Sequence, residues 1–191
     1  MPIQLTPVEA RILGCLVEKA TLTPEAYPLS FNALLNACNQ KTSRDPVMEL
    51  DFDALGVGMA ALKEKGLAGE RIGNRVPKFV HHAELLKAGE SPEVLGILCV
   101  LLLRGAQTAA EIRVRTERMA QFPSNEAVEA QLQKLQDHPG GPFVARLVRG
   151  RVQHLFCGAA PSEPAAAPNR LSQLEERVAA LERAVRSLQE H

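Results

Sequence analysis

The sequence is poor in aromatic residues and has no tryptophan: Phe, Tyr and Trp together make up 4% of 191 residues. A surface that binds single-stranded nucleic acid needs rings on which bases stack, so this composition gives little support to such a site. An excess of one charge is missing as well, because 22 Lys and Arg balance 22 Asp and Glu. The chain as a whole is therefore not expected to be drawn to nucleic acid or to a membrane surface.

Long hydrophobic runs and paired cysteines are also absent. The most apolar stretch, residues 94–103, has about half the length of a membrane-spanning helix and predicts a buried helix. The N-terminus lacks the basic and apolar regions of a secretion signal. The cysteines are far apart and form no CxxC pair. We therefore expect no membrane association and a reduced, cytoplasmic setting.

The motifs of common catalytic and cofactor sites are missing too. The five histidines show neither HExxH nor the paired Cys/His spacing of a zinc site. There is no P-loop, no GxGxxG after a strand and no GxSxG elbow. Cys38 lies on an apolar helical stripe, which favours a packed core thiol over a nucleophile. These absences predict a protein that is not an enzyme and uses no metal or cofactor.

The stretch from residue 51 to residue 80 predicts a helix followed by a β-hairpin. Asp51 can cap the helix, and Gly66 can supply the left-handed residue at its end. Residues 67–72 and 76–80 can then pair around Gly73-Asn74. The spacing of the apolar residues places four of them on one inner helical face, namely Phe52, Leu55, Met59 and Leu62.

Two further helices precede this stretch, and the whole plan then returns. Thr6 and Glu9 predict a capping box for the first helix, and Ser30 caps the second. Caps at Ser91, Thr108 and Ser124 predict three more helices, followed by strands at 142–148 and 152–157. Three helices and a hairpin form the winged-helix variant of the helix-turn-helix.

The predicted fold class is therefore α+β, predominantly α, with two tandem winged-helix domains and a C-terminal coiled-coil-like helix. The expected boundaries are residues 1–82 and 91–158 for the domains, 83–90 for a bridge, 159–169 for a Pro/Ala-rich linker and 170–191 for the helix. In this last segment, apolar residues alternate at steps of three and four, as in a parallel two-stranded coil. We predict a homodimer formed through Leu171, Leu174, Val178, Leu181, Val185 and Leu188. The alternative is a helix that docks on its own domain.

The predicted third helix of each domain is poorly suited to reading bases. Its outward face carries Asp53, Val57, Ala60 and Glu64 in the first domain, and carboxylates again flank Gln133 and Lys134 in the second. The basic residues lie in the loop before that helix and on the hairpins, where they can contact phosphate. The predicted contact residues for nucleic acid or another partner are Lys41, Arg44, Arg71, Arg75, Lys78, Arg113, Arg146, Arg149 and Arg151. The alternative for the hairpin arginines is that they solvate exposed strands.

Four segments resemble the YceH-like family of bacterial proteins, whose function is unassigned. They are NACNQKTSRDPVM (36–48), GNRVPK (73–78), LLLRGAQT (101–108) and GPFVARL (141–147). The resemblance covers residues 1–158 and extends to the C-terminal segment. It implies a tandem winged-helix fold and no particular reaction.

Two functional hypotheses follow. The first is a dimeric, non-enzymatic winged-helix protein that binds DNA weakly through its hairpins and the polar loop at 36–48. The second is a protein-interaction adaptor with an unknown protein partner and no nucleic-acid binding. The loop itself allows two interpretations: a contact surface led by Lys41 and Arg44, or polar side chains that satisfy the backbone of an irregular segment. Gly56 and Gly58 weaken a helix, so we expect another backbone or a partner to approach closely there.

Overall fold

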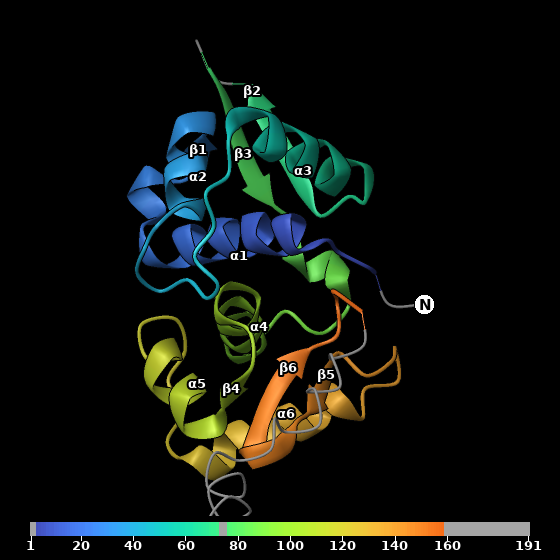
Figure 1. Ribbon diagram of the computed structural model, residues 1–191. Coiled ribbons are helices and arrows are strands. Elements are labelled where there is room, and N and C mark those ends of the chain that lie inside the picture. The colour runs from blue at the N-terminus through green and yellow to red at the C-terminus, as the bar shows by residue number, and fades with distance from the viewer. Residues whose placement is uncertain (1–2, 73–75, 159–191) are drawn as a thin grey trace, which may run out of the picture. The chain divides into compact units, whose positions relative to one another are not determined.

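The computed structural model describes residues 3–72 and 76–158, which belong to one compact unit, Met1–Ala160. Its class is α+β, as predicted. The described residues form six α-helices and two small antiparallel sheets of three strands each (Figure 1). The gap at residues 73–75 includes the predicted Gly73-Asn74 turn and Arg75, and the predicted linker and coiled-coil helix also lie outside the described residues.

The N-terminal half of this unit begins with α1 and ends with β3. Its elements are α1 (Pro7–Leu22), a 3-10 turn (Pro24–Ala26), β1 (Leu29–Ser30), α2 (Phe31–Cys38), α3 (Phe52–Glu64), β2 (Ala68–Ile72) and β3 (Pro77–His81). Strand β3 is central in the sheet order β1-β3-β2. The β2–β3 register pairs Glu70 with Phe79 and Arg71 with Lys78.

The C-terminal half repeats this order of elements. After a 3-10 turn (Ala83–Leu86), it contains α4 (Pro92–Arg104), β4 (Gln107–Thr108), α5 (Ala109–Thr116), α6 (Asn125–Gln136), β5 (Val144–Arg146), a 3-10 turn (Val148–Gly150) and β6 (Arg151–His154). The sheet order β4-β6-β5 matches that of the first sheet. The division of the chain at residues 82 and 91 stays a prediction.

The residues that cap the helices are those predicted from the sequence. Thr6 with Glu9, and Thr108 with Glu111, form the two predicted capping boxes, which begin α1 and α5. The remaining predicted caps each accept a hydrogen bond from the third residue beyond them, and they are Ser30, Asp51, Ser91 and Ser124. Each such bond satisfies a backbone N–H that would have no partner in the first helical turn, so these residues fix where the helices start.

The structure differs from the sequence-based expectation in its shortest strands. The strands β1 and β4 contain two residues each, directly before α2 and α5. Two residues are too few to show the alternation of side chains that marks a strand in a sequence. They become strands because β3 and β6 lie alongside and supply the hydrogen-bonding edge.

Phe52 also differs from its expected position. It was predicted on the inner face of α3, but its side chain is 59% exposed. Its ring stacks on that of Phe31 at a centroid distance of 5.6 Å. Phe52 occupies the first turn of α3, where the neighbouring element is α2, so it packs sideways against α2. Leu55, Met59 and Leu62 are buried as predicted.

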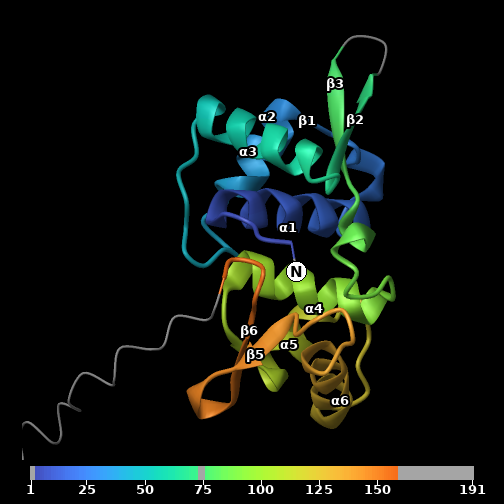
Figure 2. The same cartoon turned by 90° about the vertical axis from the view of Figure 1, so that its right-hand side faces the viewer.

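Helices α1 and α4 pack against each other and join the two halves (Figure 1, Figure 2). Every residue of α1 from Glu9 to Val17 is buried, as expected for a helix covered on all sides. Gly14 permits the close approach, since a Cβ atom there would lie 2.9 Å from Leu103 Cδ2. One continuous hydrophobic core therefore includes residues from both halves. Across the described helices, we find none with the length and apolarity that crossing a membrane requires.

Candidate interaction surface

The polar loop between α2 and α3 is tied down by its own side chains. The Asn39 side chain donates to Leu50 O and accepts from Leu50 N, both at 2.8 Å, which closes the loop. The backbone N–H of Asp45 donates to Leu103 O of α4 at 2.9 Å. The loop therefore links the two halves, and these contacts favour the interpretation in which its polar groups satisfy the backbone.

Arg44 lies inside the molecule and is only 5% exposed. Its two terminal nitrogens donate to the two carboxylate oxygens of Glu18 at 3.1 and 2.6 Å, and its Nε donates to Ala37 O. Burial acts to lower the pKa of Arg44, but the hydrogen bonds and charge of Glu18 outweigh it, and the pKa is raised. In this position Arg44 holds the loop on α1 and α2, and its guanidinium is not available to a partner at the surface.

Three more of the predicted contact residues make intramolecular contacts. Arg146 donates to Glu129 of α6 at 2.8 Å. Arg113 donates to the carbonyl oxygens of Phe122 and Pro123. Arg151 is 4.0 Å from a carboxylate oxygen of Glu111. The two ion pairs are exposed and therefore weak, but each reduces the charge offered to a phosphate, whereas the carbonyl oxygens that Arg113 contacts leave its charge unchanged.

The other predicted cations are exposed: Lys41 in the loop, Arg71 on β2, Lys78 on β3 and Arg149 in the turn before β6. No ion pair is recorded for these four within the described residues. Arg71 and Lys78 are direct cross-strand partners, so two like charges lie next to each other. Figure 2 shows the β2–β3 hairpin and the β5–β6 hairpin extending in opposite directions, so the structure does not bring the two basic groups together.

The outward face of α3 is apolar at its centre and acidic at its ends. Val57 is 72% exposed, and Ala60 one turn further on is exposed too. Asp53 and Glu64 flank them on the same face. A Cβ atom at Gly56 would meet nothing within 4 Å, so the helix surface is open there as well.

The two lysines at the end of α3 do not change this charge pattern. Lys63 pairs with Glu70 at 2.6 Å, and Lys65 pairs with the buried Glu9. The central part of this face therefore carries no positive charge that could meet a phosphate group.

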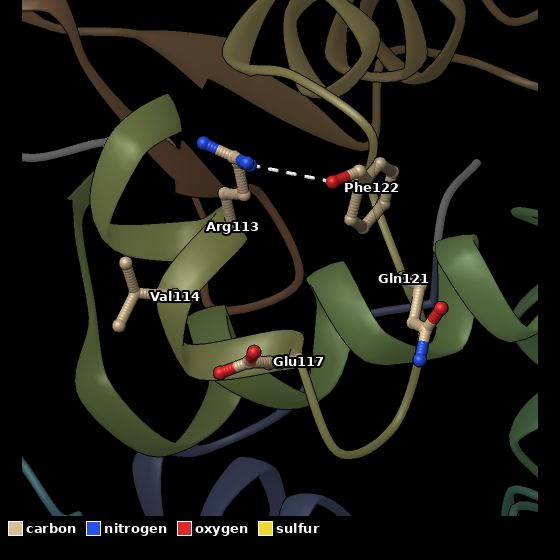
Figure 3. A pocket seen from close by; sticks show the side chains of 5 residues that line it. All are labelled: Arg113, Val114, Glu117, Gln121 and Phe122. Carbon is tan, nitrogen blue, oxygen red and sulfur yellow. Dashed lines mark hydrogen bonds between the residues drawn. The ribbon is translucent and has the colours of Figure 1, made fainter.

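A second exposed feature is a hollow beside α5 with a volume of about 410 Å³. Val114 and Glu117 line it from the helix side, and Gln121 and Phe122 line it from the following segment (Figure 3). Arg113 is directed at Phe122, to whose carbonyl oxygen it donates a hydrogen bond. In a catalytic site the polar groups converge on one point, and the polar groups of this hollow do not. Within residues 3–72 and 76–158, no group of three or more His, Cys, Asp or Glu is arranged to hold a metal ion.

Comparison with known proteins places the chain in a family. A family model described as "Protein of unknown function, DUF480" matches residues 5–153. The chain belongs to this family. It is 43% identical to a UPF0502 protein of Vibrio parahaemolyticus over 202 residues, which cover 100% of this chain and 94% of the relative.

Two further relatives show the same extent of similarity. A UPF0502 protein of Aeromonas hydrophila is 41% identical, covering 100% of this chain and 97% of the relative. A UPF0502 protein of Vibrio campbellii is 41% identical, covering 94% and 92%. The resemblance to the YceH-like family is thereby confirmed. Neither the family description nor the names of these relatives assign an activity.

Sequence reasoning identified the outward face of α3 but missed two features near it. It placed Phe52 in the core, although this ring extends the apolar surface toward α2. It also overlooked Arg11, which is 1% exposed in the middle of α1. The available signal was an arginine next to the apolar stripe of Ile12 and Leu16, where a charged side chain needs buried partners.

Proposed function

We propose that the two halves are winged-helix folds that work by binding rather than catalysis, and that the outward face of α3 docks a protein partner. The order of elements in each half, helix, strand, helix, helix and hairpin, supports the winged-helix interpretation. The observation that carries the docking function is the exposed apolar centre of α3, formed by Gly56, Val57 and Ala60 between Asp53 and Glu64.

The position of α3 is the one from which a helix-turn-helix protein reads bases. Guanine is read by Arg or Lys and adenine by Asn or Gln; this face has no Arg, Asn or Gln, and its one lysine, Lys63, lies at the C-terminal end and pairs with Glu70. Asp53 and Glu64 would also meet the phosphate backbone with like charge. The same face suits a protein surface better, since an apolar centre with a polar rim is the usual anatomy of an interface.

Gly56 gives a second argument for a closely fitting partner. Glycine inside a helix costs about 1 kcal/mol relative to alanine. The space above Gly56 is open, so nothing within the described residues requires a missing side chain there. A partner helix that approaches the backbone at Gly56 and Ala60 makes use of this flat surface, as small residues do wherever helices pack closely.

The charges indicate the chemistry of the partner. Asp53 and Glu64 lie about three helical turns apart at the two ends of the apolar centre. A second copy of this face, packed antiparallel, would place carboxylate against carboxylate. A partner helix with an apolar stripe and Lys or Arg at both ends is complementary instead, and we propose an occupant of this kind.

In-cell photocrosslinking tests this proposal. We replace Val57 with p-benzoylphenylalanine and, as a matched control, replace Val114, which is 71% exposed on α5 beside Arg113 and Arg115. The Val57 probe is expected to give one discrete protein adduct that the Val114 probe does not give. Mass spectrometry should map the adduct to an apolar segment flanked by Lys or Arg, and Asp53→Lys with Glu64→Lys should abolish it.

The other outcomes contradict the proposal in different ways. An adduct with a second copy of the chain would show that the face is a self-association surface. An adduct sensitive to nuclease would show contact with nucleic acid. No adduct above the Val114 control, or an adduct unaffected by the two charge reversals, would refute docking of a basic partner on α3.

The cross-strand pair of Arg71 and Lys78 favours one second candidate, the binding of DNA phosphate by the first hairpin. Two adjacent cations repel each other, and a phosphate between them relieves that repulsion. Fluorescence anisotropy on mixed-sequence duplex DNA across a salt series tests this role. Binding that weakens steeply with salt and is lost in Arg71→Glu with Lys78→Glu would support it, and no association at low salt would exclude it.

A further inference from the structure

A cavity of about 180 Å³ lies where the two halves meet. Helix α1 contributes Ala10 and Arg11 to its lining, α4 contributes Leu102, and β6 contributes Gln153 and His154. The exposed residues Asp45 and Cys157 also belong to the lining and place its mouth at the surface. No residue of α3, β2 or β3 lines the cavity, so it is separate from the face of α3.

Arg11 is a buried charge without a counter-ion among the described residues. It is 1% exposed, and its terminal nitrogens donate to Cys38 O at 3.0 Å and to Pro46 O at 2.5 Å. Its Nε is buried and has no hydrogen-bond partner in the part of the chain that the structure describes. A buried charge that is not paired is costly, and burial accordingly lowers the pKa of Arg11.

Arg44 provides an internal comparison. It is buried to a similar degree, yet Glu18 neutralises it through two hydrogen bonds. The fold therefore supplies one buried arginine with a carboxylate and leaves the other beside a cavity. Among the residues that line this cavity, Asp45 is the only acidic one, and it lies exposed at the mouth.

His154 adds a second polar group without a partner. It is 6% exposed, and its ring stacks on that of Phe156 at a centroid distance of 5.9 Å. Its Nδ1 is buried and has no hydrogen-bond partner among residues 3–72 and 76–158. Burial lowers the pKa of His154 to about 4, so the ring is neutral near pH 7 and donates one N–H. In the tautomer that carries this proton on Nδ1, the nitrogen is a buried donor, and such a donor is normally satisfied by a bound group or by ordered water.

We propose that this cavity binds a small anion, of the size of inorganic phosphate or a short carboxylate, on Arg11 with His154 as a second hydrogen-bond donor. The anion supplies the missing counter-charge of Arg11. The volume corresponds to about six water molecules, which is enough for such an ion. Because the lining comes from both halves, the bound anion links α1 to β6 and stabilises the junction.

Thermal unfolding and calorimetric titration of the full chain test the proposal. Inorganic phosphate and acetate are titrated separately at constant ionic strength against sodium chloride. At least one of them should raise the melting temperature in a saturable way and bind with a stoichiometry of about one. The absence of saturable binding by both anions in the millimolar range would overturn the proposal.

Three variants separate this site from general attraction of anions. His154→Phe retains a ring beside Phe156 and should weaken binding about tenfold, and Arg11→Met should abolish it. Arg118→Met removes an exposed arginine that does not line the cavity and should leave binding unchanged. If a residue has a purely structural role, its substitution would lower the melting temperature of the anion-free protein. The saturable rise in melting temperature on adding the anion would remain. Undiminished binding in His154→Phe would overturn the proposal even if Arg11→Met does not fold.

Discussion

At the scale of single residues, the chain uses buried polar groups to hold the α2–α3 loop, whose Asp45 N–H in turn donates to Leu103 O of the other half. Arg44 fixes the α2–α3 loop to α1 through Glu18, and the carbonyls that Arg11 reaches belong to α2 and the same loop. Such groups are sensitive points, because removing one partner leaves the other buried and unsatisfied. His154 is a third buried polar residue, on the opposite side of the junction, and it makes stability depend on pH.

We expect the free energy of unfolding to fall as the pH is lowered from about 6.5 toward 4. The folded-state pKa of His154 is about 4, below the ordinary value of 6.5, so protons bind the unfolded chain preferentially. The stabilising contribution is fully present above pH 6.5 and is lost as the pH falls to the folded-state pKa. The loss amounts to about 3 kcal/mol for a shift of this size.

Urea unfolding at several pH values measures this contribution. His154→Phe should flatten the decrease between pH 6.5 and 4, because no proton can then be taken up at this position. His138→Phe, at a partly buried histidine of the same half, serves as the control and should keep the decrease. Equal slopes for the wild type and His154→Phe would show that His154 does not set the pH dependence.

At the scale of elements, α3 contains two glycines with opposite surroundings. A Cβ atom at Gly58 would lie 2.6 Å from Ile12 Cδ1 and 3.0 Å from Val8 Cγ1, so this glycine allows α3 to pack closely on α1. A close approach is present there, but it is made by side chains of α1 and not by the other backbone or the partner that the sequence predicted. At Gly56 the space is open, and the reason for a glycine must come from outside the described residues.

Alanine at the two positions should therefore change stability in opposite directions. Gly56→Ala is expected to stabilise the protein by about 1 kcal/mol, the gain in helix propensity. Gly58→Ala gains the same propensity but introduces an overlap that costs roughly 1–3 kcal/mol, so it should be neutral to destabilising by about 2 kcal/mol. The midpoints of urea unfolding measure both, and a larger gain for Gly58→Ala than for Gly56→Ala would contradict the packing of α3 on α1.

At the scale of the whole molecule, the predicted oligomeric state rests on the sequence of residues 170–191. The heptad pattern from Leu171 to Leu188 predicts a parallel two-stranded coil, and these residues lie outside those that the structure describes. The prediction of a homodimer therefore rests on the sequence. A partner for α3 would then meet two copies of the docking face, and its apparent affinity would rise with the effective concentration of the second site.

Sedimentation of the full chain and of a chain cut before Arg170 tests the dimer. We expect the full chain to sediment as a dimer and the shortened chain as a monomer, because the apolar seam is then missing. Leu174→Glu with Leu181→Glu introduces charge at two d positions and should have the same effect in a chain of full length. An unchanged mass after the cut would exclude dimerisation through this segment.

Much of the fold was predictable because local interactions define it. Side-chain caps at Thr6, Asp51 and Thr108 start helices through contacts within four residues, and Gly66 ends α3 with a φ of 74°. The two-residue strands were not predictable, since they depend on a neighbouring strand distant in sequence. For the candidate surface, helical periodicity predicted the outward face of α3. It did not predict whether each arginine is buried, paired or exposed.

The sequence by itself determined where helices begin, which face of α3 turns outward, and the family to which the chain belongs. These properties depend on neighbours within a few residues or on the sequence as a whole. Only the tertiary structure decided that Arg44 is buried on Glu18, that Phe52 lies on the surface beside Phe31, and that Arg11 and His154 line one cavity. Each of these depends on segments that are distant in the chain and are brought together by the packing of α1 with α2, α3 and α4.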